Sequence, residues 1–246
     1  MARCCQTKGT EVMEFFIAGT DTDVGKTFVT GLLARAFVDA GYSVSVQKWV
    51  STGSGSVSND CCYVYRCMGI CGDCSAGSDS APYCMPFPAS PHLAAEMAGV
   101  SIDTEKIRDA CRRLGSTAGI LLVEGVGGVF VPLSGDVFLI DLVGEMKMPV
   151  VIVARSGLGT LNHTFLTLEA LRARGIKVAG VILNSQGGED PVIVQDNVKT
   201  ISRLGNVKVL GVIPRVEKFE AALPAVFQII RYLVDFPGSR GKSEGD

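Results

Sequence analysis

Short apolar runs alternate with segments of helical spacing along most of this chain. The apolar runs have the length of strands and cover residues 14–19, 43–48, 118–123, 149–154, 178–183 and 207–213. Apolar residues recur every three or four positions in residues 25–40, 91–98, 103–114, 160–174, 190–204 and 218–234. Runs such as 149–154 are apolar throughout, which is typical of parallel strands buried on both faces. The pattern predicts a single doubly wound α/β domain over residues 1–236, with a mainly parallel sheet and helices on both faces.

Two stretches do not follow this alternation. Residues 51–90 are rich in Ser, Gly, Cys and Pro, and we expect an irregular segment there. Residues 237–246 are mostly polar and small, and we expect a disordered tail.

Composition narrows the possible classes of function. The chain has 246 residues, of which 47% are hydrophobic, and this is enough for a sizeable core. The net charge of −2 is dispersed, so we expect no nucleic-acid groove and no basic patch for a membrane surface. No apolar run is long enough to span a bilayer, and the N-terminus lacks the apolar core of a secretory signal. The nine cysteines are an odd number that argues for reduced thiols, and we predict a cytoplasmic protein.

The stretch Gly19–Thr27 reads Gly-Thr-Asp-Thr-Asp-Val-Gly-Lys-Thr, between the first apolar run and the first helical segment. A strand, a tight loop and a helix in this order form a phosphate cradle, because backbone N–H groups and the positive helix end point at the anion. Lys26 would place a positive charge on the β- and γ-phosphates of ATP, and the Thr27 hydroxyl would reach Mg²⁺. In the general motif the first glycine would stand one position later, at Thr20. We predict a P-loop NTPase architecture in which ATP contacts Asp23, Val24, Gly25, Lys26, Thr27 and Phe28.

Charged side chains end two other predicted strands. Glu124 follows the run 118–123 and precedes Gly125-Val126-Gly127, and Lys48 ends the run 43–48. Ligands of open parallel sheets bind beyond the carboxyl ends of the strands. A carboxylate there suits Mg²⁺, and a lysine there can stabilise a second anion beside the γ-phosphate. Asp60 is a further candidate metal ligand. For Glu124 the flanking glycines favour the metal role, because they allow close approach of the backbone to a ligand. Taken alone, Lys48 is better interpreted as a solvated surface lysine, and Asp60 too is weak evidence in isolation.

Two later connections are candidate binding segments. Residues 156–163 follow an apolar strand and open a helix, so their N–H groups either receive a carboxylate or phosphate or merely form a connection. Asn184 follows the next apolar strand, where its amide either reads a base edge or satisfies the turn.

Six cysteines lie within residues 61–84. Cys67, Cys71 and Cys74 have the C-x₃-C-x₂-C spacing of radical iron–sulfur enzymes, but a phosphate loop already occupies the first strand–helix unit. We interpret these cysteines as one apolar face of a helix, because free cysteine packs like a small hydrophobic residue.

Taken together, these residues resemble the dethiobiotin synthetase family. The order and spacing of the matching segments extend from about residue 14 to about residue 216. The resemblance rests on Gly19–Thr27, Lys48–Gly53, Ser90–His92, Val123–Gly128, Pro132–Ser134 and Gly159–His163. The extra residue in the phosphate loop is normal for this family.

The resemblance implies an ATP- and Mg²⁺-dependent homodimer of biotin synthesis that closes a ureido ring on 7,8-diaminopelargonate with carbon dioxide or bicarbonate. Lys26 and Lys48 would be the catalytic cations, and the metal ligands would be Thr27, Asp60 and Glu124. Substrate contacts would come from Thr22 and Thr52 and, on the partner subunit, from Gly159, Thr160 and Asn162. Further ATP contacts would come from Asp60, Glu124, Gly125, Val126, Gly127, Asn184, Ser185, Pro214, Arg215 and Val216.

The chain departs from the family pattern at three positions. Trp49 stands where a proline usually follows the lysine, and Thr52 replaces a common serine. Ser185 stands where an aspartate often follows the base-reading asparagine, which bears on nucleotide selectivity.

Two other classes share the strand–loop–helix start. A ParA- or MinD-like ATPase switch carries a signature lysine five residues before the lysine of Gly-Lys-Thr, and Asp21 stands there. A cobyrinate synthase of the amidotransferase type would need an additional glutaminase domain, for which we find no room in this sequence.

Overall fold

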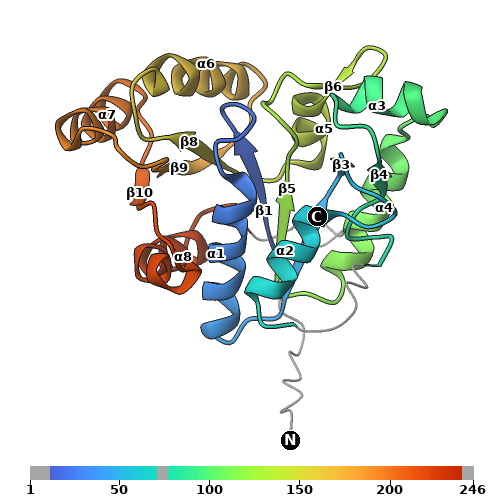
Figure 1. Cartoon of the computed structure of the whole chain (residues 1–246), viewed down its shortest axis with the longest axis horizontal. Coiled ribbons are helices and arrows are strands. Elements are labelled where there is room, and N and C mark those ends of the chain that lie inside the picture. The colour runs from blue at the N-terminus through green and yellow to red at the C-terminus, as the bar shows by residue number, and fades with distance from the viewer. Residues whose placement is uncertain (1–11, 71–76, 240–246) are drawn as a thin grey trace, which may run out of the picture.

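Six parallel strands form the centre of the protein. The computed structural model describes residues 12–70 and 77–239. The strands are β1 (Met13–Gly19), β2 (Val44–Lys48), β5 (Ile120–Glu124), β8 (Val150–Arg155), β9 (Val178–Asn184) and β10 (Val209–Ile213). They lie side by side in the order β10-β9-β8-β1-β5-β2 (Figure 1). Every run predicted as a strand belongs to this sheet, so the predicted fold class is confirmed.

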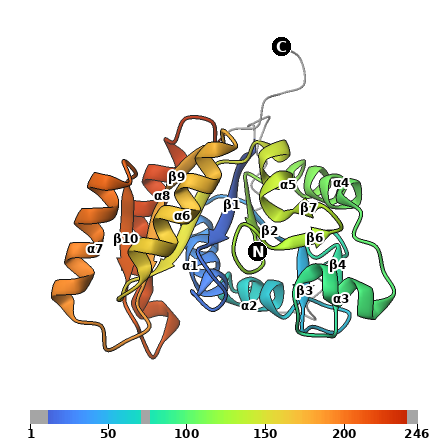
Figure 2. The same ribbon diagram turned by 90° about the horizontal axis from the view of Figure 1, so that it is seen from above.

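Helices cover both faces of the sheet, because successive strand residues point to opposite sides. In β1, Phe15 and Ile17 pack on one side, and Phe16 and Ala18 pack on the other. The first side is covered by α1 (Lys26–Asp39), α2 (Asn59–Cys67) and α8 (Phe227–Val234). The second side is covered by α4 (Thr104–Gly115), α5 (Leu139–Met146), α6 (Thr160–Ala173) and α7 (Pro191–Leu204). Figure 2 shows α7 at one end of the molecule and α3 (Pro91–Ala98) at the other.

The two helices that border the predicted site, α1 and α6, begin differently from the capped helices α4 and α7. Asp103 caps α4 by accepting a hydrogen bond from the N–H of Glu105, and Asp190 caps α7 in the same way. By contrast, α1 begins after Gly25 and α6 begins after Gly159, and neither helix has a side-chain cap. Both glycines have a positive φ, 91° and 89°, which other residues adopt only at a cost. The first turns of α1 and α6 therefore keep N–H groups for a ligand.

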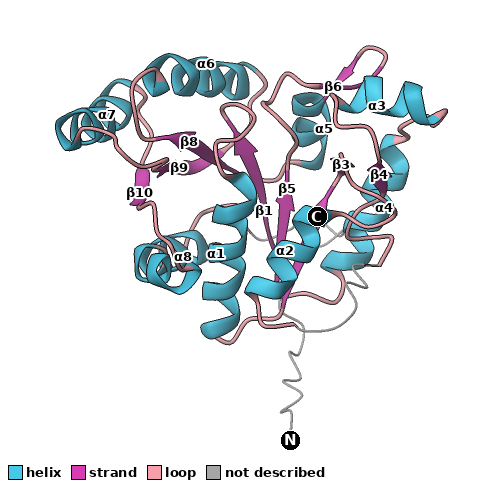
Figure 3. Ribbon diagram, viewed as in Figure 1, coloured by secondary structure: helices cyan, strands magenta, loops and turns pink. Residues whose placement is uncertain are grey.

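The described part of the segment 51–90 is more regular than its composition predicts (Figure 3). It contains α2 and a separate two-stranded parallel sheet of β3 (Val50–Thr52) and β4 (Tyr83–Met85). These strands are too short to produce a periodic pattern. In α2, only Cys61 and Val64 are buried, so the apolar signal is also weak.

Three further elements differ from the prediction. The segment 218–234, expected as one helix, is a 3₁₀ helix (Phe219–Ala225) followed by α8. Pro224 lies inside the 3₁₀ helix and has no N–H to donate, which explains the interruption. The hairpin of β6 (Pro132–Ser134) and β7 (Val137–Phe138), and the helix α5 after it, were not predicted as separate elements.

The predicted cysteine helix is wrong in its extent. The helix α2 ends at Cys67, and Gly69 follows with a φ of 78°, which stops a right-handed helix. Cys71 and Cys74 lie outside the described residues. Cys67 itself packs on α1, where a Cβ added at Gly31 would lie 3.1 Å from the Cys67 Sγ.

The predicted tail lies partly inside the described residues. Ser239 is buried, and its backbone carbonyl accepts a hydrogen bond of 2.8 Å from the N–H of Glu14 in β1. Residues 237–239 therefore do not belong to a disordered tail, and residues 240–246 lie outside the described part. Within residues 12–70 and 77–239, no helix has the length and apolar character needed to cross a membrane.

The close packing of β9 against β10 predicts a test of the fold. A Cβ added at Gly180 would lie 2.5 Å from Leu210 Cγ and 2.8 Å from the carbonyl oxygen of Lys208. We expect Gly180→Ala to lower the free energy of unfolding by about 1–3 kcal/mol in urea denaturation, because the core must move to admit the methyl group.

Gly144→Ala in α5 is the matched control for this test. A Cβ added at Gly144 would lie 3.7 Å from Ile176 Cδ1, which is an ordinary van der Waals contact. Alanine also favours the helix over glycine by up to about 1 kcal/mol. Equal stabilities of the two variants would contradict the packing described for Gly180.

Candidate active site

The carboxyl ends of β1, β2 and β5 bring the predicted charged residues together. Glu124 is the last residue of β5, and in the parallel register it lies opposite Ile17 of β1 and Lys48 of β2. The phosphate loop follows β1 directly. A parallel sheet places all of these strand ends on one edge, which is where ligands of such folds bind.

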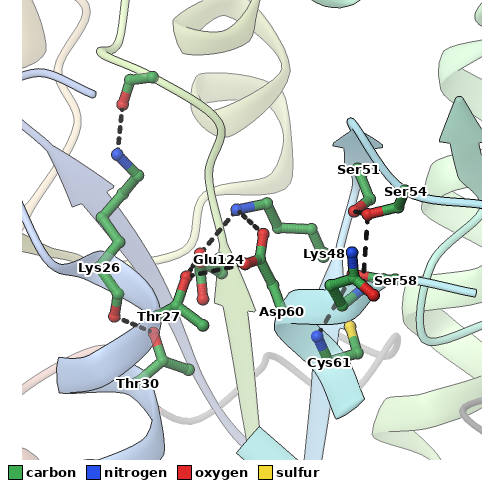
Figure 4. Close-up of polar contacts among 12 residues, drawn as sticks. Lys26, Thr27, Thr30, Lys48, Ser51, Ser54, Ser58, Asp60, Cys61 and Glu124 are labelled. Carbon is green, nitrogen blue, oxygen red and sulfur yellow. Dashed lines mark hydrogen bonds and ion pairs between the residues drawn. The ribbon is translucent and has the colours of Figure 1, made fainter. Parts of the chain in front are cut away.

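Four side chains form a connected polar group, here called the Lys48 cluster: Lys48, Glu124, Asp60 and Thr27 (Figure 4). The Lys48 Nζ lies 2.6 Å from Glu124 Oε1 and 2.9 Å from Asp60 Oδ2. The Thr27 Oγ1 lies 2.8 Å from the same oxygen of Glu124 and 3.2 Å from Asp60 Oδ1. The cluster therefore joins α1, α2, β2 and β5.

The Lys48 cluster is charged and largely buried. Lys48 and Glu124 are only 6% and 2% exposed, whereas the Asp60 side chain is 37% exposed and forms the solvent side of the cluster. Burial by itself disfavours the charged amine, but the Glu124 and Asp60 carboxylates outweigh it and raise the pKa of Lys48. Lys48 is thus a permanent cation held at the strand ends.

Lys26 has a different environment. Its Nζ donates hydrogen bonds of 2.9 Å to the carbonyl oxygens of Asp21 and Gly127, which joins the phosphate loop to the loop after β5. Burial, together with the neighbouring Lys48, lowers the pKa of Lys26 to about 8. A Cβ at Gly19 would lie 2.6 Å from the Lys26 Nζ, so the glycine leaves the space for this lysine.

Asn184 contacts the phosphate loop directly. Its Nδ2 donates a hydrogen bond of 3.0 Å to the carbonyl oxygen of Val24. A Cβ at Gly25 would lie 2.1 Å from that nitrogen, so glycine is required both for this approach and for the positive φ. At least one amide hydrogen of Asn184 is thus bound to the phosphate loop, a contact that the sequence did not predict.

The loops expected to contact the base lie beside one another. The N–H of Ser185, after β9, donates to the carbonyl oxygen of Ile213 at the end of β10. A Cβ at Gly187 would lie 3.3 Å from Arg215 Cγ. Pro214 and Arg215 are exposed and Val216 is half-buried, so all three are placed at the rim of this edge.

The start of α6 borders the phosphate loop. A small surface pocket there is lined by residues of both segments: Thr20, Val24, Arg155, Leu158, Gly159, Thr160 and His163. Arg155 links the two segments, because its Nη2 donates a hydrogen bond of 3.2 Å to the carbonyl oxygen of Thr22. Thr160 is buried, and Gly159 and Asn162 are exposed.

Not every predicted site residue joins the Lys48 cluster. Thr22 and Asp23 are exposed at the tip of the phosphate loop, and Phe28 packs edge-on against Phe219 in the first face. Thr52 is half-buried in β3. Val126 is half-buried in the loop after β5. Among the described residues, no side-chain contact links these five to the cluster.

The oxygen donors of the cluster fit a magnesium ion. Mg²⁺ prefers hard oxygen ligands and is usually held by one or two carboxylates, a hydroxyl and substrate phosphates. Thr27, Asp60 and Glu124 supply two carboxylates and a hydroxyl within hydrogen-bond distance of one another. In the described residues, no group of three or more His, Cys, Asp and Glu side chains forms a metal cage. The set therefore suits a metal that arrives with a phosphate ligand.

Sequence reasoning assigned no role to the residues that hold Lys48 in place. Trp49 is fully buried, and its Nε1 donates a hydrogen bond of 3.0 Å to Gln47 Oε1. Gln47 Nε2 donates to the carbonyl oxygen of Asp79, and the N–H of Lys48 donates to that of Ser80. The only signal in the sequence is a glutamine and a tryptophan on either side of the lysine.

Comparison with known proteins decides the family. A family model described as an AAA domain matches residues 13–222. The ATP-dependent dethiobiotin synthetase BioD of Halalkalibacterium halodurans is 37% identical over 208 residues, covering 82% of this chain and 85% of the relative. The protein of the same name from Anoxybacillus flavithermus is 40% identical over 210 residues, covering 83% and 93%. The chain belongs to the dethiobiotin synthetase family.

Solved structures share the fold of this dethiobiotin synthetase family member at much lower identity. A chain of the MinC:MinD cell division complex of Aquifex aeolicus has a TM-score of 0.59 and 16% identity, covering 91% of this chain and 96% of its own. The septum site-determining protein MinD of Pyrococcus horikoshii has a TM-score of 0.53 and 18% identity, covering 93% and 91%. At these identities the likeness establishes the P-loop NTPase fold alone. The MinD-like alternative is therefore less supported than the dethiobiotin synthetase assignment.

Glu189 holds the loop after Asn184 in place. Its carboxylate accepts hydrogen bonds from Ser156 Oγ, Ser185 Oγ and the N–H groups of Gln186 and Gly187. Partial burial opposes ionisation, but the hydrogen bonds from Ser185, Gln186 and Ser156 lower the pKa of Glu189 to about 2 from an ordinary 4.5.

This environment predicts a pH-dependent stability difference between the wild type and Glu189→Gln. The folded pKa is lower than the unfolded one, so the carboxylate stabilises the fold above pH 4.5, and this contribution is lost as the pH falls toward 2. At pH 7 we expect Glu189→Gln to unfold with about 1 kcal/mol less free energy in urea. The difference should shrink in measurements between pH 4.5 and pH 3. A difference that stays constant over this range would contradict the role given to the carboxylate.

Proposed function

We propose that this chain is an ATP-dependent dethiobiotin synthetase that closes a ureido ring on 7,8-diaminopelargonate with carbon dioxide. The observation that carries the proposal is the position of Lys48. Its buried ammonium contacts two carboxylates, and one of them also accepts a hydrogen bond from Thr27 of the phosphate loop. This arrangement supplies a phosphate cradle, a metal site and a second cation on one edge of the sheet. Family membership supports the reaction class.

The reaction needs two anions beside each other. One substrate amine takes up carbon dioxide and loses a proton, which gives a carbamate. A carbamate oxygen attacks the γ-phosphorus of ATP and ADP leaves. The second amine then attacks the carbamoyl carbon, phosphate leaves, and the ring closes. The enzyme must therefore hold a carbamate against a triphosphate while negative charge develops.

The residues of this chain divide that task. The N–H groups at the start of α1 receive the β- and γ-phosphates, and Lys26 neutralises charge on them. Lys48 stabilises the carbamate beside them. Thr27, Asp60 and Glu124 would hold Mg²⁺, which when bound neutralises phosphate charge. Asn184, Ser185 and the residues 214–216 border the base.

We further propose that the active site is shared between two subunits of a cytoplasmic homodimer. The N–H groups at the start of α6 are uncapped and suit the substrate carboxylate. Asn162 and Gly159 are exposed there, so a partner subunit can present them to the Lys48 cluster of the first subunit. Thr22 and Thr52 would line the diamine between them.

The direct test is to assay dethiobiotin and phosphate together. The purified protein, given ATP, Mg²⁺, bicarbonate and 7,8-diaminopelargonate, should form dethiobiotin and phosphate in equal amounts, measured by mass spectrometry and a phosphate assay. Lys26→Ala should lower the rate by about 10²- to 10³-fold, because no other group of the loop replaces its charge. A switch ATPase would instead release phosphate without the diamine, and that result would contradict the proposal.

A mixing experiment tests the shared site. We expect Asn162→Ala to raise the KM for the diamine far more than the KM for ATP. We expect Lys48→Gln to bind ATP normally in calorimetry and to form almost no product. At a diamine concentration far below the raised KM, where each variant alone is nearly inactive, mixed dimers should regain activity because one of their two composite sites is intact. No recovery after verified subunit exchange would place the whole site within one chain.

A further inference from the structure

Lys48 and the expected metal ion use the same ligands. The Lys48 Nζ contacts both carboxylates of the cluster, Glu124 at 2.6 Å and Asp60 at 2.9 Å. The Glu124 oxygen that it contacts is also the one contacted by Thr27, at 2.8 Å. In Figure 4, the Lys48 ammonium is directed at the same group of oxygens as the Thr27 hydroxyl.

Simple electrostatics makes these two cations competitors. A carboxylate oxygen that accepts a short hydrogen bond from an ammonium has less electron density and less space for a divalent ion. A divalent ion at the same oxygens would also repel the ammonium, and the burial of Lys48 and Glu124 reduces screening by water. Lys48 therefore has to give up part of its contact when a metal binds.

A substrate anion can give Lys48 a new partner in place of Glu124. Glu124 is 2% exposed and lies opposite Lys48 on the neighbouring strand, so Lys48 cannot leave it for solvent without breaking a buried ion pair. A substrate anion at the same strand edge would replace the lost partner.

We propose that Lys48 competes with divalent metal for Glu124 and Asp60, and that the substrate carbamate relieves this competition by drawing Lys48 to itself. The identity of the relieving anion rests on the proposed function, whereas the competition rests on the contacts of this chain alone. The consequence is cooperative loading: metal binds weakly until carbamate is present, and the two then bind together. Such coupling limits ATP turnover in the absence of the diamine.

The test measures metal binding rather than turnover. Mn²⁺, detected by electron paramagnetic resonance, is the probe for the nucleotide-free protein, and Mg²⁺ serves as its competitor. Lys48→Met keeps the length of the side chain but removes its charge, and we expect it to bind Mn²⁺ at least tenfold more tightly than the wild type. Adding Glu124→Gln to this variant should abolish the gain in Mn²⁺ affinity. That loss would show that the ion binds at Glu124.

Lys26→Met is the matched control. It removes the same charge from a neighbouring buried lysine whose Nζ is hydrogen-bonded to carbonyl oxygens and forms no ion pair within the described residues, so we expect its Mn²⁺ affinity to stay within threefold of the wild type. If both lysine variants gain the same Mn²⁺ affinity, the gain comes from the change in net charge alone, and the proposed competition is wrong. Equal affinities of Lys48→Met and the wild type would also overturn it.

A second measurement uses the wild type and does not depend on the folding of a variant. Adding 7,8-diaminopelargonate and bicarbonate without nucleotide should tighten Mn²⁺ binding at least fivefold, and Mn²⁺ must tighten substrate binding by the same factor. The Lys48→Met variant should show no such change. An unchanged Mn²⁺ affinity in the wild type would overturn the relief step.

The outcomes separate this inference from the proposed function. If the wild type makes dethiobiotin and its metal affinity is independent of Lys48, the competition is wrong and the function stands. If Lys48→Met tightens Mn²⁺ binding in a protein that makes no dethiobiotin, the competition stands without that function.

Discussion

The buried ion pair between Lys48 and Glu124 is the constraint on which the rest of the site depends. Removing two charges from water costs several kcal/mol each, and their attraction offsets this only with good geometry and further hydrogen bonds. The structure meets both conditions, because the register of β2 and β5 places the residues opposite each other and Thr27 and Asp60 satisfy the remaining positions. A site held in this way keeps a cation beside the phosphate loop in every molecule.

The sheet and its second face supply the rigidity that this ion pair needs. Phe16 of β1 packs against Trp49 with ring centroids 4.8 Å apart, directly beneath the strand ends that carry the pair. A Cβ at Gly125 would lie 2.9 Å from Phe16 Cζ, so the residue after Glu124 is in contact with the same aromatic ring. Trp49 is also hydrogen-bonded to Gln47. Both strand ends thus rest on one packed aromatic pair, and movement of either end would disturb the core.

The phosphate loop is connected to this framework through backbone carbonyls rather than carboxylates. Lys26 joins the carbonyl oxygens of Asp21 and Gly127, and Asn184 holds that of Val24. These carbonyl oxygens are neutral partners. A phosphate can displace a neutral partner from a lysine at lower cost than it can displace a carboxylate. The two lysines therefore differ in their partners although they are neighbours: Lys26 is hydrogen-bonded to neutral carbonyl oxygens, and Lys48 is paired with two carboxylates.

The sequence by itself determined the six strands of the sheet, the phosphate loop and the strand-end positions of Lys48 and Glu124, because these follow from short-range hydrophobic pattern and from parallel topology. It did not determine α2, which brings Asp60 to Lys48, nor the contacts of Asn184 with Val24 and of Glu189 with Ser156. Each of those depends on the path of a loop and on close packing between elements, as between α1 and α2, where a Cβ added at Gly31 would lie only 3.1 Å from the Cys67 Sγ. Only the tertiary structure decided them, because local residue pattern carries no information about which distant side chains share a cavity once the chain has folded.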